Sequence, residues 1–258
     1  MNLIAIRHQQ TFTHGHSRPM LIVAEEPSQD ARHEIVLKLG PDVQSGRTGL
    51  AIEAICADLA TRLGLNAAQG WTVEINADFA ASVPDAEARR RLGVATGLQF
   101  GSTFHSGQYH VPLADDALTD PLIDKAAAVL LFDAMIGNDD RHRLKPNCLL
   151  RGDDIILIDH ERAFPGLRAE FRPAAWENGG LDVIRNHAFF SGLHGQLPDF
   201  ADAAQAWRAV TPSVVAELVA SVPAEWLDNA GRNRATHFMV EMVANVNKVS
   251  SLLTEILR

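Results

Sequence analysis

The feature that most constrains the fold is an apolar segment in the middle of the chain that runs directly into a highly polar loop. Residues 122–136 read LIDKAAAVLLFDAMI, and residues 137–147 read GNDDRHRLKPN. Asp120 and Pro121 precede the apolar segment, and proline is favoured at the first position of a helix. We therefore predict a strongly apolar helix that ends in a loop rich in acids, arginines and asparagines.

Two short apolar runs, 147–150 and 155–158, follow the loop and are joined by the tight turn RGDD, which predicts a β-hairpin. A phosphoryl-transfer site needs a carboxylate to orient the attacking hydroxyl, oxygen ligands for Mg²⁺ and a lysine for the nucleotide phosphates. Asp140, Asn147 and Asp159 stand in the order in which kinase-like catalytic loops place a base and two metal ligands. The spacing therefore favours a metal–ATP site on this hairpin.

The first third of the chain contains short apolar runs separated by turn-rich segments, followed by a stretch with helical periodicity. Lys38 lies on one predicted strand and Glu53 on the helix that follows, so a Lys–Glu ion pair would hold the lysine for phosphate binding. We predict the order strand, strand, helix, strand over residues 20–24, 34–39, 49–63 and 71–75.

Beyond residue 84 the sequence changes character. Residues 84–94 are predicted to form a short helix, and residues 97–112, which read GLQFGSTFHSGQYHVP, are interpreted as a connector that could act as a hinge. Residues 200–258 show helical spacing, so Trp207 and Trp226 are expected in the core of these last helices. We expect an α+β protein with a β-rich N-terminal lobe, 1–97, and a mainly helical C-terminal lobe, 98–258.

Composition narrows the class of protein. A chain of 258 residues with 47% apolar and 21% charged residues is long enough for one large domain or two lobes. The formal charge of −9 argues against nucleic acid as a partner, because such binders usually carry a basic surface. We expect no nucleic-acid partner.

The cysteines and the apolar runs indicate the compartment. Cys56 and Cys148 both lie inside apolar runs, so a disulfide framework is not expected and a reducing compartment is favoured. The first ten residues are too polar for a signal peptide, and Asp133 interrupts the longest apolar run. We therefore expect a cytoplasmic protein without a membrane partner.

The segment FDAMIGNDDRHRLKPNCLLRGDDIILIDHERAF resembles the active-site region of HipA-like kinases, in particular a short branch with a DR-x-x-x-x-P-N loop followed by LIDH. This branch is related at greater distance to phosphoinositide-type kinases, whose loop also carries DRH. Four other pieces agree in order: THGHSRPMLIV, the lysine of EIVLKL, an IE dipeptide on the next helix, and GLQFGS. The resemblance covers roughly residues 10–165.

The resemblance implies a protein-kinase-like bilobal fold that binds ATP and Mg²⁺ between its lobes. It implies Asp140 as the catalytic base, Asp159 as the main metal ligand, and Lys38 as the phosphate contact with Glu53 as its partner. The backbone around His14 would lie over the phosphates, and GLQFGS would line the adenine pocket. The positions implied in nucleotide binding are Gly15, His16, Ser17, Lys38, Gln99, Phe100 and Gly101.

One position departs from the family pattern, in which a metal-binding asparagine sits five residues after the base. Here that position is Lys145, and Asn147 remains two residues later. Either Asn147 has taken the metal role or the site holds metal less well. A lysine there would either repel Mg²⁺ or stand in for part of its charge.

Three functions remain open at this point. The first is an ATP/Mg-dependent kinase of the HipA type that phosphorylates a Ser or Thr, with a protein as the favoured but unidentified acceptor. The second is a nucleotide-binding pseudokinase that signals by conformation, which Lys145 favours. The third is a metal-dependent hydrolase that would use Asp139, His142, Asp159 and His160.

Structural roles compete with these functional ones. Taken singly, Asp140 and Asp159 would be a helix-end cap and a turn residue. Arg141 is interpreted as an internal brace paired with a nearby carboxylate, and His142 as a structural residue of the loop. His160 is interpreted as a packing residue or an indirect contact of the site.

Overall fold

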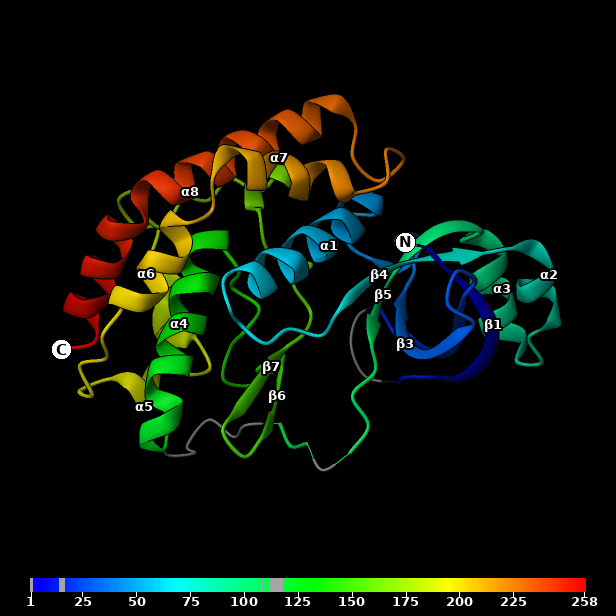
Figure 1. Cartoon of the computed structure of the whole chain (residues 1–258), viewed down its shortest axis with the longest axis horizontal. Coiled ribbons are helices and arrows are strands. Elements are labelled where there is room, and N and C mark those ends of the chain that lie inside the picture. The colour runs from blue at the N-terminus through cyan, green and yellow to red at the C-terminus, as the bar shows by residue number, and fades with distance from the viewer. Residues whose placement is uncertain (1, 14–16, 108, 112–117) are drawn as a thin grey trace.

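The computed structural model describes residues 2–13, 17–107, 109–111 and 118–258. Strands with two short helices gather at one end, most of the helices gather at the other, and a single helix, α1, lies between the two groups (Figure 1). The chain is thus a mixed protein of strands and helices, as the sequence predicts. His14, Gly15 and His16 lie outside the described residues, so only Ser17 of the expected phosphate loop can be placed.

The strands close into a barrel in the order β1-β2-β3-β5-β4, with β1 and β4 paired in parallel to complete the circle. The predicted strands β2 and β3 form the expected hairpin, whereas β1 was not predicted. Alternate side chains of β1, β2, β3 and β4 point inward, as Leu3 and Ala5 do on β1, and this builds one hydrophobic cluster. The five strands are β1 (Asn2–Thr11), β2 (Met20–Glu26), β3 (Ala31–Lys38), β4 (Gly70–Ile75) and β5 (Gly97–Thr103).

β5 corrects the interpretation of residues 97–112 as a connector. Residues 97–103 are a strand paired with both β3 and β4, so the expected lobe boundary at residue 97 falls at its first residue. The strand was not predicted because its glycines are typical of turns and connectors. A Cβ atom built on Gly101 would lie 2.3 Å from Cγ2 of Ile35, so the barrel closes here only around a residue without a side chain.

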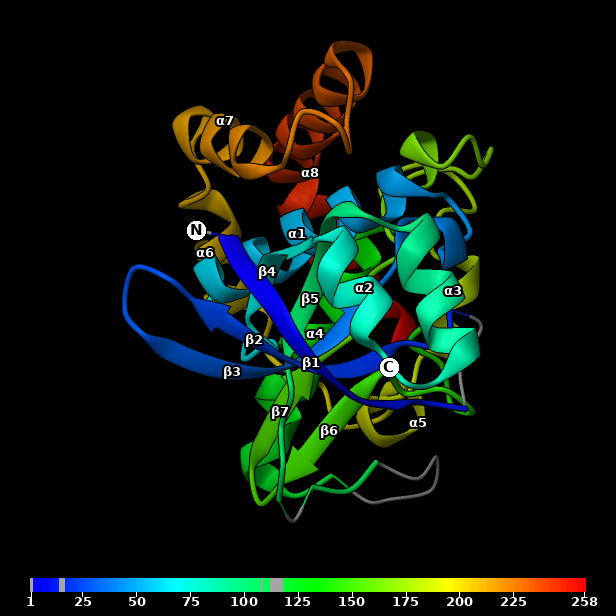
Figure 2. The same cartoon turned by 90° about the vertical axis from the view of Figure 1, so that its right-hand side faces the viewer.

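Helices α2 (Ala77–Ser82) and α3 (Ala86–Val94) cover one side of the barrel (Figure 2). Each begins with a side chain that accepts a backbone N–H, Asn76 from Phe79 and Asp85 from Ala88. Leu92 on α3 joins the barrel cluster. The predicted helix 84–94 is therefore present and serves the barrel, whereas α2 was not predicted.

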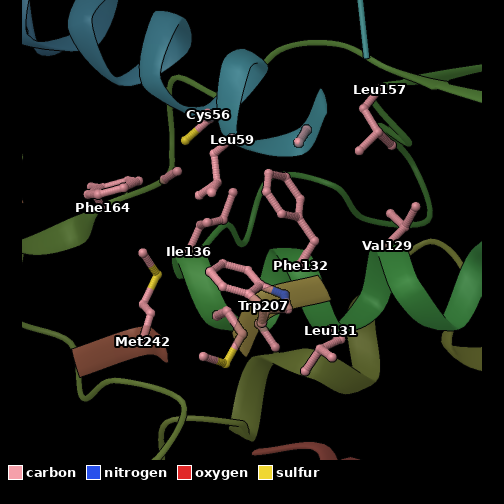
Figure 3. Close-up of a cluster of buried hydrophobic side chains, with 14 of the residues drawn as sticks. Cys56, Leu59, Val129, Leu131, Phe132, Ile136, Leu157, Phe164, Trp207 and Met242 are labelled. Carbon is pink, nitrogen blue, oxygen red and sulfur yellow. The ribbon is translucent and has the colours of Figure 1, made fainter. Parts of the chain in front are cut away.

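A second hydrophobic cluster holds the helical part together. Side chains from α1 (Arg47–Arg62) and α4 (Asp120–Ile136) meet there, with Leu59 on one helix and Phe132 on the other (Figure 3). The predicted helix 122–136 is confirmed: it runs from Asp120 to Ile136 with Pro121 in its first turn, and Gly137, which has a φ of +68°, caps its end. Its side chains are buried on nearly all faces, so the polar loop that follows is anchored in the core.

The C-terminal stretch is helical, as predicted, and forms several helices. Asp228 caps the longest of them by accepting the N–H of Gly231. Trp207 and Trp226 are buried, as expected, and the Nε1 of Trp226 donates to the carbonyl of Leu98 on β5. Among the described residues, no helix is long and apolar enough to cross a membrane. The helices are α5 (Phe190–Leu193), α6 (Ala201–Arg208), α7 (Pro212–Ser221) and α8 (Asn229–Ile256).

Candidate active site

The polar loop 138–147 leads from α4 into the predicted hairpin, which is formed by β6 (Cys148–Arg151) and β7 (Asp154–Leu157). Asn147 and Asp159, at the two open ends of the hairpin, have left-handed backbones with φ of +47° and +59°. Asparagine and aspartate tolerate this conformation better than other residues with side chains. The hairpin therefore brings these two oxygen-bearing side chains to the same edge.

Arg141 holds the loop to the core. Its side chain is fully buried, and its Nε donates to Oδ2 of Asp133 on α4 at 2.6 Å. Its Nη1 donates to the carbonyls of Asn147 and, at 3.3 Å, Ile158. One guanidinium thus ties together the helix, the loop and the end of β7, which confirms the predicted internal brace.

Asp133 is the hub of this brace, and sequence analysis did not identify it as a site residue. Its Oδ1 accepts from Nδ2 of Asn138 at 2.8 Å, and its Oδ2 lies 3.0 Å from Nε2 of His187. Burial alone would raise the pKa of Asp133, but Arg141 and His187 outweigh it and hold this pKa well below its usual range. The available signal was the position of an acid inside an otherwise apolar helix.

His187 joins the brace from a distant segment. Its Nδ1 accepts the N–H of Phe189 at 3.2 Å, so Nε2 carries the proton that is donated to Asp133. The neighbouring backbone also pairs with the loop, because the N–H of Ala188 donates to the carbonyl of Arg141. No local sequence motif predicts this contact, because His187 lies 54 positions after Asp133.

Lys38, at the end of β3, lies at the centre of a group of acids. Its Nζ donates to Glu53 of α1, to Oδ1 of Asp159 at 2.7 Å and to Glu161 at 3.3 Å. Burial alone would lower the pKa of Lys38, but Asp159, Glu53 and Glu161 raise it well above the usual value, so the amine stays charged. The structure therefore brings the expected lysine and glutamate together and adds two further carboxylates.

Glu53 is fixed on both of its oxygens. Oε1 accepts from Lys38, and Oε2 accepts the backbone N–H of His160 at 2.8 Å. Burial would raise the pKa of Glu53, but Lys38 and the hydrogen bond from His160 together lower it by more, so the carboxylate is ionised. The ring of His160 packs edge-on against Phe132, 5.8 Å between centroids, which agrees with its expected packing role.

Asp140 and Asn147 form the open side of the same group. Nδ2 of Asn147 donates to the carbonyl of Asp140 at 3.1 Å and to its Oδ2 at 3.0 Å. Lys145 reaches the same Oδ2 at 2.5 Å and Oδ2 of Asp159 at 3.2 Å. The residues expected as base and metal ligands thus lie together, with an ammonium group between the two aspartates.

The acids in this group suit a hard divalent cation. Oxygens of Glu53, Asp159 and Glu161 lie within 4.8 Å of one another. Asn147 uses its Nδ2 in the hydrogen bonds to Asp140, so its Oδ1 could bind a metal. Carboxylate and amide oxygens are the ligands that Mg²⁺ prefers. Glu161 was not singled out from the sequence, although it stands two residues after Asp159. Burial raises its pKa.

The expected nucleotide positions on β5 are packed against protein. Gln99 is 1% exposed, accepts the N–H of Gly40 at 2.7 Å and donates to the carbonyl of Ala95 at 2.9 Å. Phe100 is 2% exposed and belongs to the helical cluster. An adenine pocket along GLQFGS would therefore depend on backbone groups, because the side chains of Gln99 and Phe100 are engaged within the protein. The carbonyl of Ser17 accepts from Arg91 at 3.1 Å.

The set expected for a hydrolase is not gathered in one place. Asp139 pairs instead with Arg172, at 2.6 Å, and with Arg162, at 3.6 Å. Across the described part of the chain, the one group of acids, histidines and cysteines close enough to hold a metal is the group around Lys38. The geometry therefore disfavours a site built from Asp139, His142, Asp159 and His160.

Comparisons with known proteins agree on one family. A model of the HipA-like kinases matches residues 36–254, and no curated protein matches. The crystal structure of the Helicobacter pylori proinflammatory kinase CtkA superposes with a TM-score of 0.56 at 10% identity, covering 100% of this chain and 99% of that one. At this identity the superposition shows a shared fold. Because the family model spans most of its length, the chain belongs to the HipA-like kinase family.

Proposed function

We propose that the protein transfers the γ-phosphoryl group of ATP to a Ser or Thr hydroxyl of a protein, in a Mg²⁺-dependent reaction. The observation that carries this proposal is the ion-pair group in which Lys38 bonds to Glu53, Asp159 and Glu161 beside Asp140. It joins the barrel to the helical part, which suits a bilobal kinase with ATP bound between the two.

Each member of the group has a role in this proposal. Lys38, kept charged by its acidic neighbours, would bind phosphate oxygens, while Glu53 keeps its amine in place. Asp159, Glu161 and Oδ1 of Asn147 would hold the cation. Bound Mg²⁺ would neutralise the phosphate oxygens as the phosphoryl group moves.

Asp140 would orient the acceptor hydroxyl. The hydroxyl oxygen forms a bond to the γ-phosphorus, the bond from that phosphorus to the β–γ bridging oxygen breaks, and ADP leaves with the electron pair. The hydroxyl proton passes to the carboxylate of Asp140. The hydrogen bonds from Asn147 and Lys145 fix this carboxylate before substrate arrives.

A thermal-shift titration with ATP, with and without Mg²⁺, tests the proposal on the wild type and on Asp159→Ala. We expect a Mg²⁺-dependent rise in melting temperature that disappears in the variant, because ligand binding to the folded state stabilises it. Asp139→Ala, which alters a neighbouring acid outside the group, is the matched control and should keep the rise. Absence of any shift with nucleotide would contradict the proposal.

The second candidate is a nucleotide-binding pseudokinase. The observation that favours it is the ammonium of Lys145, which contacts both Asp140 and Asp159. A rise in melting temperature that ignores both Mg²⁺ and the Asp159→Ala change, without turnover of ATP, would support it.

A further inference from the structure

Lys145 holds an unusual position between the two aspartates of the site. Its Nζ lies 2.5 Å from Oδ2 of Asp140, in the loop, and 3.2 Å from Oδ2 of Asp159, which lies just after β7. Lys38 takes the other oxygen of Asp159, Oδ1, at 2.7 Å. Each oxygen of Asp159 therefore already bonds to a different ammonium group.

The backbone keeps Lys145 in this place. Its N–H donates to the carbonyl of His142 at 2.9 Å, and its own carbonyl accepts the N–H of His142 at 3.1 Å, which closes a tight turn. Pro146, which is buried, follows directly and restricts the chain after the turn. The side chain is 39% exposed, so the ammonium reaches the aspartates from the open side of the site.

The charges of the group fit one divalent cation. When all are ionised, four carboxylates face two ammonium groups, which leaves two negative charges: Asp140, Asp159, Glu53 and Glu161 against Lys38 and Lys145. One Mg²⁺ would neutralise that remainder. A second ion bridging Asp140 and Asp159 would need the space that the ammonium of Lys145 occupies, and like charges a few ångströms apart repel strongly.

We propose that Lys145 is the second cation of this site, so that the nucleotide-bound protein takes one divalent ion where a site with two bridging metals would take two. The ammonium links Asp140 to Asp159 and supplies positive charge on the side of the acceptor. The inference rests on the proposed nucleotide site. It makes the lysine part of the machinery that binds the transferring group, whereas in the pseudokinase reading the lysine blocks that machinery.

Counting bound Mn²⁺ by electron paramagnetic resonance, with a non-hydrolysable ATP analogue, tests the inference. We expect one ion per wild-type chain and one for Lys145→Arg, which keeps the charge. We expect two for Lys145→Asn, which removes the charge and offers an oxygen, with the second ion bound at least tenfold more tightly than in the wild type. Lys125→Asn is the matched control. Its Nζ donates to the carbonyl of Asp153, outside the site, so this variant should bind one ion.

The outcomes separate this inference from the proposed function. Two ions on the wild type, two on Lys145→Arg, or equal counts for wild type and Lys145→Asn would overturn the role of Lys145 while leaving the nucleotide site intact. If Lys145 only braced the loop, Lys145→Asn would lower the melting temperature without changing the count. Absence of nucleotide-dependent Mn²⁺ binding in every variant would overturn the proposed function, and this inference with it.

Discussion

Two clusters of acids and bases lie side by side along the loop, and they differ in how completely their charges are enclosed. In the first, Asp133 and Arg141 have side chains with no exposure, and His187 also contacts Asp133. In the second, Asp140 and Asp159 keep 18% and 21% of their side chains exposed. The first cluster is closed to solvent, and the second is open to an incoming ligand.

The difference in burial has a different physical consequence for each cluster. Removing one partner of a buried ion pair is strongly destabilising, because the other charge stays in the core without compensation. The enclosed cluster can therefore hold the loop in one conformation. The open cluster has more carboxylates than ammonium groups, so the cation of the proposed function would balance its charge. The enclosed cluster is therefore suited to holding the loop in place, and the open cluster to the proposed chemistry.

The largest expected effect lies in the open cluster. Asp140→Ala should lower phosphoryl transfer about 10²–10⁴-fold, the usual range for loss of a general base. ATP binding and unfolding free energy should remain close to wild type. A transfer assay paired with urea unfolding measures both quantities. Asp139→Ala, the adjacent acid that pairs with Arg172, should keep transfer within tenfold. Equal losses in the two variants would show that the loop as a whole, and not Asp140, had been damaged.

The second effect lies in the enclosed cluster. Asp133→Asn should lower the free energy of unfolding by about 3–5 kcal/mol, because it leaves Arg141 buried without its counter-charge. Urea unfolding followed by tryptophan fluorescence measures the loss. Asp153→Asn, on the exposed turn of the hairpin, is the control and should change stability by less than about 0.5 kcal/mol. A loss below about 1 kcal/mol for Asp133→Asn would show that the ion pair with Arg141 contributes little to stability.

A smaller effect is expected at the far end of the brace. His187→Ala removes one donor from Asp133 and should lower stability by about 1–3 kcal/mol, since the carboxylate keeps Arg141 and Asn138. Phosphoryl transfer should fall together with loop order, while Mg²⁺-dependent ATP binding at Asp159 persists. Urea unfolding and the ATP thermal shift on the same variant check both statements. Loss of ATP binding would mean that the two clusters are not separable.

The sequence predicted the parts of the fold that carry strong periodicity. Residues 20–24, 34–39 and 122–136 were assigned from apolar runs or helical spacing that the structure retains. β1 and β5 were not predicted because their sequences lack that pattern. β1 is polar over its second half, and β5 owes its place to close packing around Gly101. Both segments become strands because they pair with their neighbours when the barrel closes, and closure depends on the whole sheet.

The candidate site divides in the same way. Lys38, Glu53 and Asp159 could be proposed from order along the chain, and they meet in the structure. Glu161 and His187 could not, because a carboxylate in a sequence does not reveal which lysine it will contact, and His187 is brought to Asp133 by tertiary packing alone. No spacing rule predicts either contact.

The smallest expected effect is the pH dependence of the stability that Asp133 contributes. Because the pKa of Asp133 lies well below that of an unfolded aspartate, about 3.9, the stability it contributes is fully present above roughly pH 5. That stability is lost progressively as the pH falls below 3.9 toward the lowered pKa. The difference in unfolding free energy between wild type and Asp133→Asn should therefore shrink with acid, by at most about 1.4 kcal/mol per pH unit.

Urea unfolding of the two proteins at pH 7, 5, 4 and 3 measures this difference. Subtracting one from the other removes the contributions of acids that both proteins share, those of the open cluster included. A constant difference down to pH 3 would mean that the carboxylate of Asp133 titrates alike in the folded and unfolded chain. Packing of the two side chains, and not their charges, would then hold the loop. A difference that narrows only below pH 4 would instead mark Asp133 as a charge kept ionised by Arg141, with the loop geometry depending on it.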